Sequence, residues 1–248
     1  MTGALALLAL GLPVGILIGL IGIGGVLLAP ALAHIFGHDI HAAVSLSLAS
    51  FVLAGVVAAA RACRPGTRLR TSDWIFLLAI VPGALAGALA APVIPAGPLS
   101  LIVSACVAFA GISCLRKPAS SGGAVSGRGI LAGMGLVTGC LSAITGTGGP
   151  LICLPMLLWK NMDVRHALLL AQIAQLPVAA TATLVNGHSG SLDFVAAGML
   201  GAAIVAGMLA GIAVSWRIET GVLRMSVAWC LIIVGLALCV IDLWRVMA

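Results

Sequence analysis

Charged side chains are scarce in this chain, and their scarcity excludes a water-soluble domain. Lysine, arginine, aspartate and glutamate make up 7% of the 248 residues, whereas a soluble domain carries roughly 25%. Hydrophobic residues account for 62% and the mean hydropathy is +1.27, so the apolar surface exceeds what a soluble core of this length buries. The composition predicts an all-α polytopic membrane protein surrounded by the lipid bilayer.

Basic residues are absent from the N-terminal region, because the first lysine or arginine is Arg61. A signal peptide needs a cationic segment ahead of its apolar stretch, so we expect the apolar N-terminus to be retained as structure. The net charge of +6 does not indicate a nucleic-acid partner. The basic residues fall in short loops between apolar stretches, where the positive-inside rule places them.

Signatures of enzymes and of metal sites are also missing. There is no HExxH motif, no GxSxG motif and no pair of mid-span carboxylates, so we expect no enzymatic activity. The cysteines form no CxxC pair and mostly fall within apolar stretches, where they are expected to be buried apolar side chains. We predict no disulfide framework, no metal site and no cofactor. The cysteines are Cys63, Cys106, Cys114, Cys140, Cys153, Cys230 and Cys239.

What the sequence does contain is a repeat with an offset of half its length. The segment GLPVGILIGLIGIGG, from Gly11, aligns with GLVTGCLSAITGTGG, from Gly135. In the same register GALAG, from Gly83, aligns with GMLAG, from Gly207. One register over this distance indicates an internal duplication, with the polar segment RKPASSGGAVSGR as the linker. We predict two transmembrane repeats within a single membrane domain, residues 1–124 and 125–248.

Each repeat begins with an apolar stretch that glycines interrupt. Residues 4–36 would form roughly 50 Å of helix, which exceeds a hydrocarbon core about 30 Å thick. Two helical arms folded back at the glycines fit better than a single crossing. We therefore predict a glycine-broken hairpin followed by three transmembrane helices in each repeat. The expected arms are 4–21, 26–36, 129–145 and 150–159, and the expected crossings are 41–61, 72–91, 98–115, 164–185, 191–215 and 219–244.

The distribution of positive charge favours inverted repeats. With a hairpin at its start, each repeat has three crossings, and an odd number turns the second copy upside down relative to the first. Every lysine and arginine except Arg245 then lies on the cytoplasmic side, as the positive-inside rule requires. The alternative, one tilted crossing over residues 4–36, stays open. It moves four basic residues outside: Lys160, Arg165, Arg217 and Arg224.

The glycine clusters at the two hairpin tips are the candidate substrate site. Glycine allows the positive φ and the close backbone approach that a tight tip requires, and Pro150 suits the first position of a helix. The second arms would begin at about Val26 and at Pro150, and each start leaves free N–H groups near mid-membrane. Two such starts facing each other would bind an anion. The candidate glycines are Gly22, Gly24, Gly25, Gly146, Gly148 and Gly149.

Polar side chains near these tips extend the candidate site. Thr147 lies in the second tip, and Ser47 and Ser50 lie in the helix after the first hairpin. Gln172 and Gln175, in the helix after the second hairpin, are three residues apart and share a helix face. The glutamines either line the substrate path or form hydrogen bonds between helices, and for Thr147 both a site role and a structural role stay open.

Several other residues are predicted to have structural roles. Small residues four apart let helices approach closely, which is the expected role of Gly83, Gly87, Gly207 and Gly211 and the alternative role of the tip glycines. Asp39 and Asp163 are expected to cap helices. The histidines lie near the ends of the spans, where loop or interface roles are expected: His34, His38, His41, His166 and His188.

The sequence resembles the sulfite exporter TauE/SafE family of bacterial membrane proteins. GLIGIGGVLLAP is similar to the first glycine motif of this family, AITGTGGPLICLP to its second, HAAVSLSLAS to the segment after the first motif, and GALAG to a later small-residue helix. The resemblance spans nearly the whole chain. It implies export of sulfite or small organosulfonates across the inner membrane.

The sequence and the resemblance together predict a secondary transporter of small anions, which holds its substrate at the midplane between the two tips. The alternatives are a passive anion channel and a structural membrane protein without transport. The driving ion is not readable, because no carboxylate lies mid-span in the helices that follow the hairpins. The oligomeric state, a homodimer included, is left open.

Overall fold

The computed structural model describes residues 2–22, 24–63, 69–115, 127–159, 162, 164–188, 192–215 and 220–247, and within this part the chain is helical and contains no strand. The helices of the first half are α1 (Thr2–Ile21), the 3-10 turn η1 (Gly25–Leu27), α2 (Leu28–His34), α3 (Ile40–Ala62), α4 (Thr71–Ala90), the 3-10 turn η2 (Ala91–Val93) and α5 (Ala96–Leu115). Those of the second half are α6 (Arg128–Thr145), α7 (Pro150–Trp159), α8 (Val164–His188), α9 (Phe194–Ser215) and α10 (Thr220–Met247).

The helix boundaries follow the glycine and proline pattern of the sequence. The helix α1 ends one residue before Gly22, α6 ends one residue before Gly146, and α7 begins at Pro150. The expected arms and crossings therefore agree closely with the helices. In the first half the second arm starts with the η1 turn at Gly25 rather than with a full helix at Val26. The Asp39 side chain accepts a hydrogen bond from the His41 backbone N–H, so the predicted cap is confirmed; Asp163 lies outside the described residues.

The lengths of the helices fit a multi-pass membrane protein. Within the described residues, six helical segments are long and apolar enough to cross a membrane: α3, α4 with η2, α5, α6, α8 and α9. The segment η1–α2 and parts of α1 and α10 are shorter apolar helices. The helix α6 is long enough to cross a membrane, although the sequence predicts it as one arm of a hairpin. The direction of α7 decides between these two possibilities, because a hairpin requires α7 to run back toward the end at which α6 begins.

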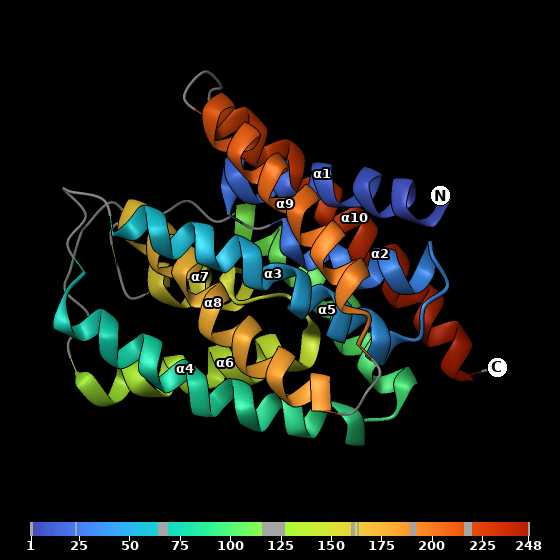
Figure 1. Cartoon of the computed structure of the whole chain (residues 1–248), viewed down its shortest axis with the longest axis horizontal. Coiled ribbons are helices and arrows are strands. Elements are labelled where there is room, and N and C mark those ends of the chain that lie inside the picture. Colours follow the sequence, from blue (N-terminus) through green and yellow to red (C-terminus); the bar gives the residue numbers. More distant parts are fainter. Residues whose placement is uncertain are drawn as a thin grey trace.

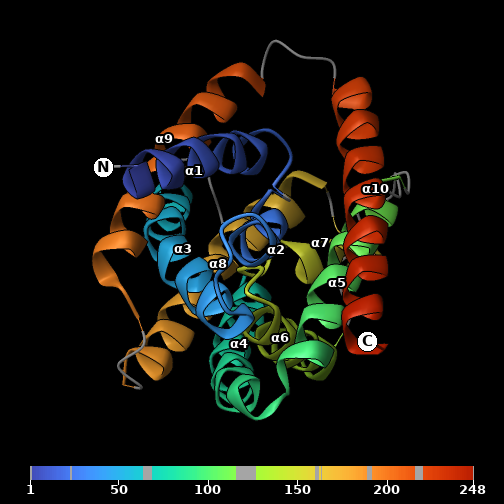
Figure 2. The ribbon, with the colours of Figure 1, turned by 90° about the vertical axis from the view of Figure 1, so that its right-hand side faces the viewer.

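The helices pack in pairs. If each helix is replaced by its counterpart in the other half, the same pairs result. In Figures 1 and 2, α1 lies along α9, α4 along α6, and α5 along α10. The helices α3 and α8 pack against each other, α3 also contacts α9, and α8 also contacts α4. Figure 2 shows α2 and α7 in the middle of the bundle, with the longer helices around them. The broken arms are therefore enclosed by protein, as irregular backbone at membrane depth requires.

Glycines make the closest contacts within two of these pairs. A Cβ atom added at Gly87 would collide with the carbonyl oxygen of Cys140, and one at Gly211 would collide with that of Ile16. These two contacts are related by the same offset of 124 residues as the sequence repeat. Further related contacts are those of Gly83 with Leu136 and of Gly207 with Leu12. The predicted packing role of the four glycines is confirmed.

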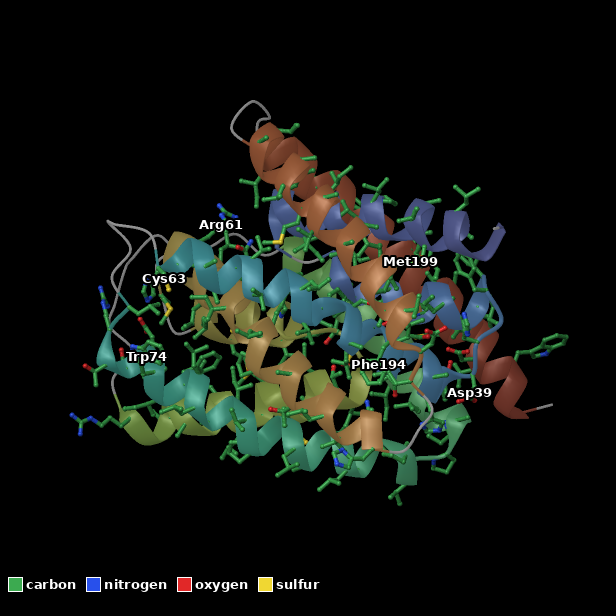
Figure 3. All side chains as sticks on the ribbon, in the orientation of Figure 1. Asp39, Arg61, Cys63, Trp74, Phe194 and Met199 are labelled. Atoms are coloured by element: carbon green, nitrogen blue, oxygen red, sulfur yellow. The ribbon has the colours of Figure 1, made fainter. Side chains whose placement is uncertain are left out.

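The ends of the bundle are distinct. In Figures 1 and 3, both chain termini and Asp39 lie at one end, and Arg61, Cys63 and Trp74 lie at the other. The first arm pair therefore leaves and returns at the same end of the molecule. Because Asp39 directly precedes α3 and Cys63 directly follows it, α3 is the first helix to connect the two ends.

An ion pair shows that the second arm pair also folds back. His166 Nε2 lies 2.9 Å from Asp73 Oδ2, so the start of α8 lies beside the start of α4. The glycine contacts of α4 with α6 advance in the same direction along both helices, so these helices are parallel. The helices α6 and α8 thus begin at the same end, and α6 with α7 forms a hairpin rather than a crossing.

Candidate functional site

In the tip of the second hairpin, three glycines have backbone angles that only glycine adopts readily. Gly146 ends α6 in the left-handed conformation at φ 70°, Gly148 has φ 73° and Gly149 has φ 116°. A side chain in this region costs about 1–2 kcal/mol per residue. Pro150 then starts α7 without an N–H group to leave unpaired, and the N–H groups of Ile152 and Cys153 donate to the carbonyl of Gly149. The positive φ predicted for this tip is confirmed.

The tip of the first hairpin reaches its turn differently. Gly22 has φ 79°, but Gly24 has φ −79° and Gly25 is not among the positive-φ glycines. The positive φ expected at a hairpin tip is therefore found at Gly22 and not at Gly24 or Gly25. Close approach explains both residues instead, because a Cβ atom at Gly24 would lie 2.5 Å from the Val14 carbonyl oxygen.

The two tips meet at the aromatic ring of Phe51, a fully buried residue of α3. A Cβ atom added at Gly25 would lie 2.9 Å from Cζ of this ring, and one at Gly148 would lie 2.9 Å from Cδ2. The same Cβ at Gly25 would lie 3.3 Å from the carbonyl oxygen of Thr147. The structure thus places the two predicted glycine clusters close to each other, with the ring of Phe51 between them. Sequence reasoning missed Phe51, although it directly follows the candidate Ser50.

Each tip also contacts the central helix of the opposite half. A Cβ atom at Gly22 would lie 3.0 Å from the Leu168 side chain on α8, and one at Gly146 would lie 3.1 Å from the Cα of Val44 on α3. These contacts again differ by 124 residues. Movement of α3 against α8 would therefore move both tips.

Gln175 of α8 is the side chain that most clearly lacks a partner in this region. It is fully buried, and neither its amide nitrogen nor its amide oxygen has a hydrogen-bond partner. The second tip lies beside it, because a Cβ atom at Gly149 would lie 3.6 Å from the Gln175 backbone nitrogen. Buried amides in folded proteins are almost always hydrogen-bonded, so this one is free for water or a ligand. Gln175 stands 124 residues after Phe51, so equivalent positions carry a ring in one half and an amide in the other.

The hydroxyl groups of the candidate site are already engaged as donors. Ser47 donates to the carbonyl of Ala43 at 2.7 Å, and Ser50 to that of Leu46 at 2.7 Å. Both serines are fully buried in α3. Each hydroxyl proton therefore serves its own helix, and the serine oxygens remain as acceptors only.

Thr147 is 2% exposed and has a similar local partner. Its hydroxyl lies 3.0 Å from that of Thr145, whose proton goes to the carbonyl of Leu141. Thr147 is therefore the donor of this pair. Gln172 is half-buried, in contrast to Gln175. Of the predicted polar residues, Gln175 thus has the clearest free donors in this arrangement.

Two buried acidic residues at the ends of the bundle were not singled out from the sequence. Asp73 and Asp242 are 1% and 3% exposed, and each lies 2.9 Å from a histidine Nε2, of His166 and His34 respectively. Both histidines lie near helix ends, and their loop or interface roles stay predictions. In the described part of the chain no group of three His, Cys, Asp or Glu residues could hold a metal ion, and the described cysteines are free.

The fold defines a class, the all-helical, multi-pass membrane proteins. Comparison with protein families identifies the member of this class. The family model described as sulfite exporter TauE/SafE matches residues 7–238, and the chain belongs to this family. The resemblance noted in the sequence is therefore confirmed, and it assigns the chain to a family of membrane transporters rather than to an enzyme family. No curated protein and no solved structure matches the chain.

Proposed function

We propose that this protein is a secondary transporter that exports small anions of the sulfite or organosulfonate class across the inner membrane. The observation that supports this most directly is the meeting of two glycine-broken hairpins at Phe51; in addition, the backbone of Gln175 lies beside the second tip and its amide has no partner. The substrate would lie between the tips, where the amide of Gln175 and the backbone N–H of Leu151, at the start of α7, donate hydrogen bonds to its oxygens.

The weakness of this site is part of the proposal. A helix N-terminus contributes about 0.3–1 kcal/mol toward an anion, and up to about 2 kcal/mol when partly buried. The glycines, Thr147 and Gln175 carry no charge, so an anion would meet only neutral donors. Removing an ion from water costs several kcal/mol, and the modest donors offset only part of this cost. Weak binding suits a carrier, which must release its substrate in every cycle.

We also propose that the halves, residues 1–124 and 125–248, are inverted repeats and that transport uses their relative motion. The helix pairs that survive exchange of the halves and the glycine contacts at the 124-residue offset support this architecture. Each tip contacts the central helix of the other half, so rocking of one half against the other would open the tips to either side in turn.

The topology of this proposal predicts opposite sides for Cys63 and Asp193, both of which are exposed. In a chain that keeps Cys63 as its sole cysteine, a membrane-impermeant maleimide should label only inside-out vesicles. In a chain whose sole cysteine replaces Asp193, the same reagent should label only intact cells. Labelling of both positions from one side would contradict the hairpins, because it is the outcome that single crossings predict.

Transport is tested with the purified full chain in proteoliposomes. Liposomes preloaded with unlabelled sulfite should take up radiolabelled sulfite faster than empty ones, because a carrier exchanges substrate across the membrane. Sulfonates such as isethionate should compete, whereas chloride and phosphate should not. Equal uptake with and without preloading would indicate a channel, and uptake no greater than in protein-free liposomes for both sulfite and sulfonates would refute the proposed function.

A further inference from the structure

A polar cluster lies where α2, α5 and α10 meet, at the end of the bundle that holds the chain termini. The carboxylate of Asp242, 3% exposed, accepts a hydrogen bond from Ser104 Oγ at 2.6 Å. Its other oxygen lies 2.9 Å from Nε2 of His34, and Ser100 lines the same cavity. Three helices that are distant in sequence thus contribute to one buried carboxylate.

Both ring nitrogens of His34 face hydrogen-bond acceptors. Nδ1 lies 3.1 Å from the carbonyl oxygen of Pro30, and Nε2 lies 2.9 Å from Oδ1 of Asp242. Both neighbours are acceptors, whereas a neutral imidazole has only one N–H group. A neutral ring would therefore direct one nitrogen lone pair at an oxygen lone pair. A protonated ring would donate to both oxygens, and its charge would cancel that of Asp242.

Protons can reach this pair through a cavity. A cavity of about 270 Å³ is lined by residues that include His34, His38, Asp39, Ser100 and Asp242. His38 and Asp39 are exposed, so the cavity lies at the surface and admits several waters, each of which occupies about 30 Å³ in the liquid. Besides His38 and Asp39, a further titratable group near the pair in the described part of the chain is Cys239 on α10, which in turn lies near Cys106 on α5.

We propose that the His34–Asp242 pair is a proton-binding site and that the proton is the coupling ion. Uptake of one proton from cavity water completes both hydrogen bonds of His34. Its release leaves the Asp242 carboxylate beside a neutral ring, and one of the two bonds is lost. At an offset of 124 residues, His34 corresponds to Leu158, Ser104 to Ala228 and Asp242 to Pro118. The other half therefore does not duplicate the site.

The helix α2 connects this pair to the hairpin tips. His34 is its last residue, and Ala29, near its start, would lie 3.3 Å from a Cβ atom at Gly146. The seven-residue helix spans roughly 10 Å, at 1.5 Å per residue. A change in the bonds of His34 therefore acts on a short rigid segment whose other end contacts the second tip. This coupling to transport rests on the proposed function, whereas proton binding itself does not.

The proton site is tested by NMR on the full chain in lipid nanodiscs with ¹⁵N-labelled histidine. We expect an imidazolium resonance with both ring nitrogens protonated, absent from His34→Gln and lost from Asp242→Asn. His38→Gln, which changes an exposed histidine of the same cavity, should retain it. A neutral His34 throughout the range of about pH 5–8, in which histidine ordinarily titrates, would overturn the proposal.

Coupling is tested in proteoliposomes with isethionate, whose sulfonate stays ionised, while potassium and valinomycin hold the membrane potential at zero. With one proton per anion, a gradient of one pH unit should produce up to about a tenfold difference in isethionate concentration across the membrane. His34→Gln and Asp242→Asn should lose this difference, and His38→Gln should keep it. A wild type that exchanges isethionate without responding to the gradient would overturn proton coupling. A wild type that exchanges neither sulfite nor sulfonate would refute the proposed function, and the NMR experiment would still decide on the proton site.

Discussion

Alanine at Gly148 is expected to lower the rate of sulfite exchange at least about tenfold, which corresponds to only about 1.4 kcal/mol of activation free energy. Gly148 has φ 73°, where a side chain costs about 1–2 kcal/mol. The new Cβ would also lie 2.9 Å from the ring of Phe51, which is fully buried and has little room to move. The substitution therefore displaces the ring or the tip at the place where the two hairpins meet.

The matched control is alanine at Gly87, a glycine in the packing of α4 against α6. Its Cβ would collide with the carbonyl oxygen of Cys140, so the two helices must separate and the melting temperature should fall. The exchange rate per folded molecule should stay within about twofold of the wild type, because the contact lies outside the tips and acts on helix packing. Rates from counterflow are divided by the amount of monodisperse protein from size-exclusion chromatography.

The comparison decides between two roles of the tip glycines. If Gly148→Ala and Gly87→Ala both lower the melting temperature and both leave exchange per folded molecule unchanged, the tip glycines serve packing alone. The substrate site between the hairpins would then be wrong. A selective loss of exchange in Gly148→Ala would support it.

Leucine at Gln175 is expected to stabilise the protein and to impair transport at the same time. A buried polar group without a partner costs about 1–3 kcal/mol, and neither amide atom of Gln175 has one. Leucine has a similar volume and no polar atoms, so the melting temperature should rise. Exchange should fall at least about tenfold, since the substrate loses a donor that corresponds to about 1.4 kcal/mol or more.

Gln172→Leu provides the comparison within the same helix. Gln172 is half-buried, so its substitution should raise the melting temperature less. If both glutamines line the substrate path, both variants should transport more slowly and only Gln175→Leu should gain stability. A destabilised Gln175→Leu protein would show that the amide has structural partners, and a stabilised one with normal exchange would remove Gln175 from the substrate path.

Local physical chemistry explains how much of the fold was predictable from the sequence. Glycine clusters and Pro150 act on the backbone within a few residues, so the ends of α1 and α6 and the start of α7 could be placed. Hydropathy over windows of about 20 residues identifies spans without any knowledge of their neighbours. The sequence also predicted the close packing of Gly87 and Gly211, because small residues four apart leave a groove on one helix face.

The first tip shows where local rules fail. The three glycines of this tip were expected to provide positive φ and close backbone approach, but Gly24 and Gly25 have ordinary backbone angles. Their lack of a side chain is required by Val14 and Phe51, which approach from α1 and α3. Whether a glycine serves conformation or close approach depends on neighbours that the local sequence does not specify.

The sequence by itself determined the class of protein, the helix boundaries and the family, because these depend on composition, local backbone preferences and recurring motifs. Only the tertiary structure placed Phe51 between the tips, left Gln175 without a partner and joined His34 to Asp242, which is 208 residues away. Hydrogen bonds and side-chain contacts act over a few ångströms in space. Which remote segments come within that distance is decided by the packing of all the helices together.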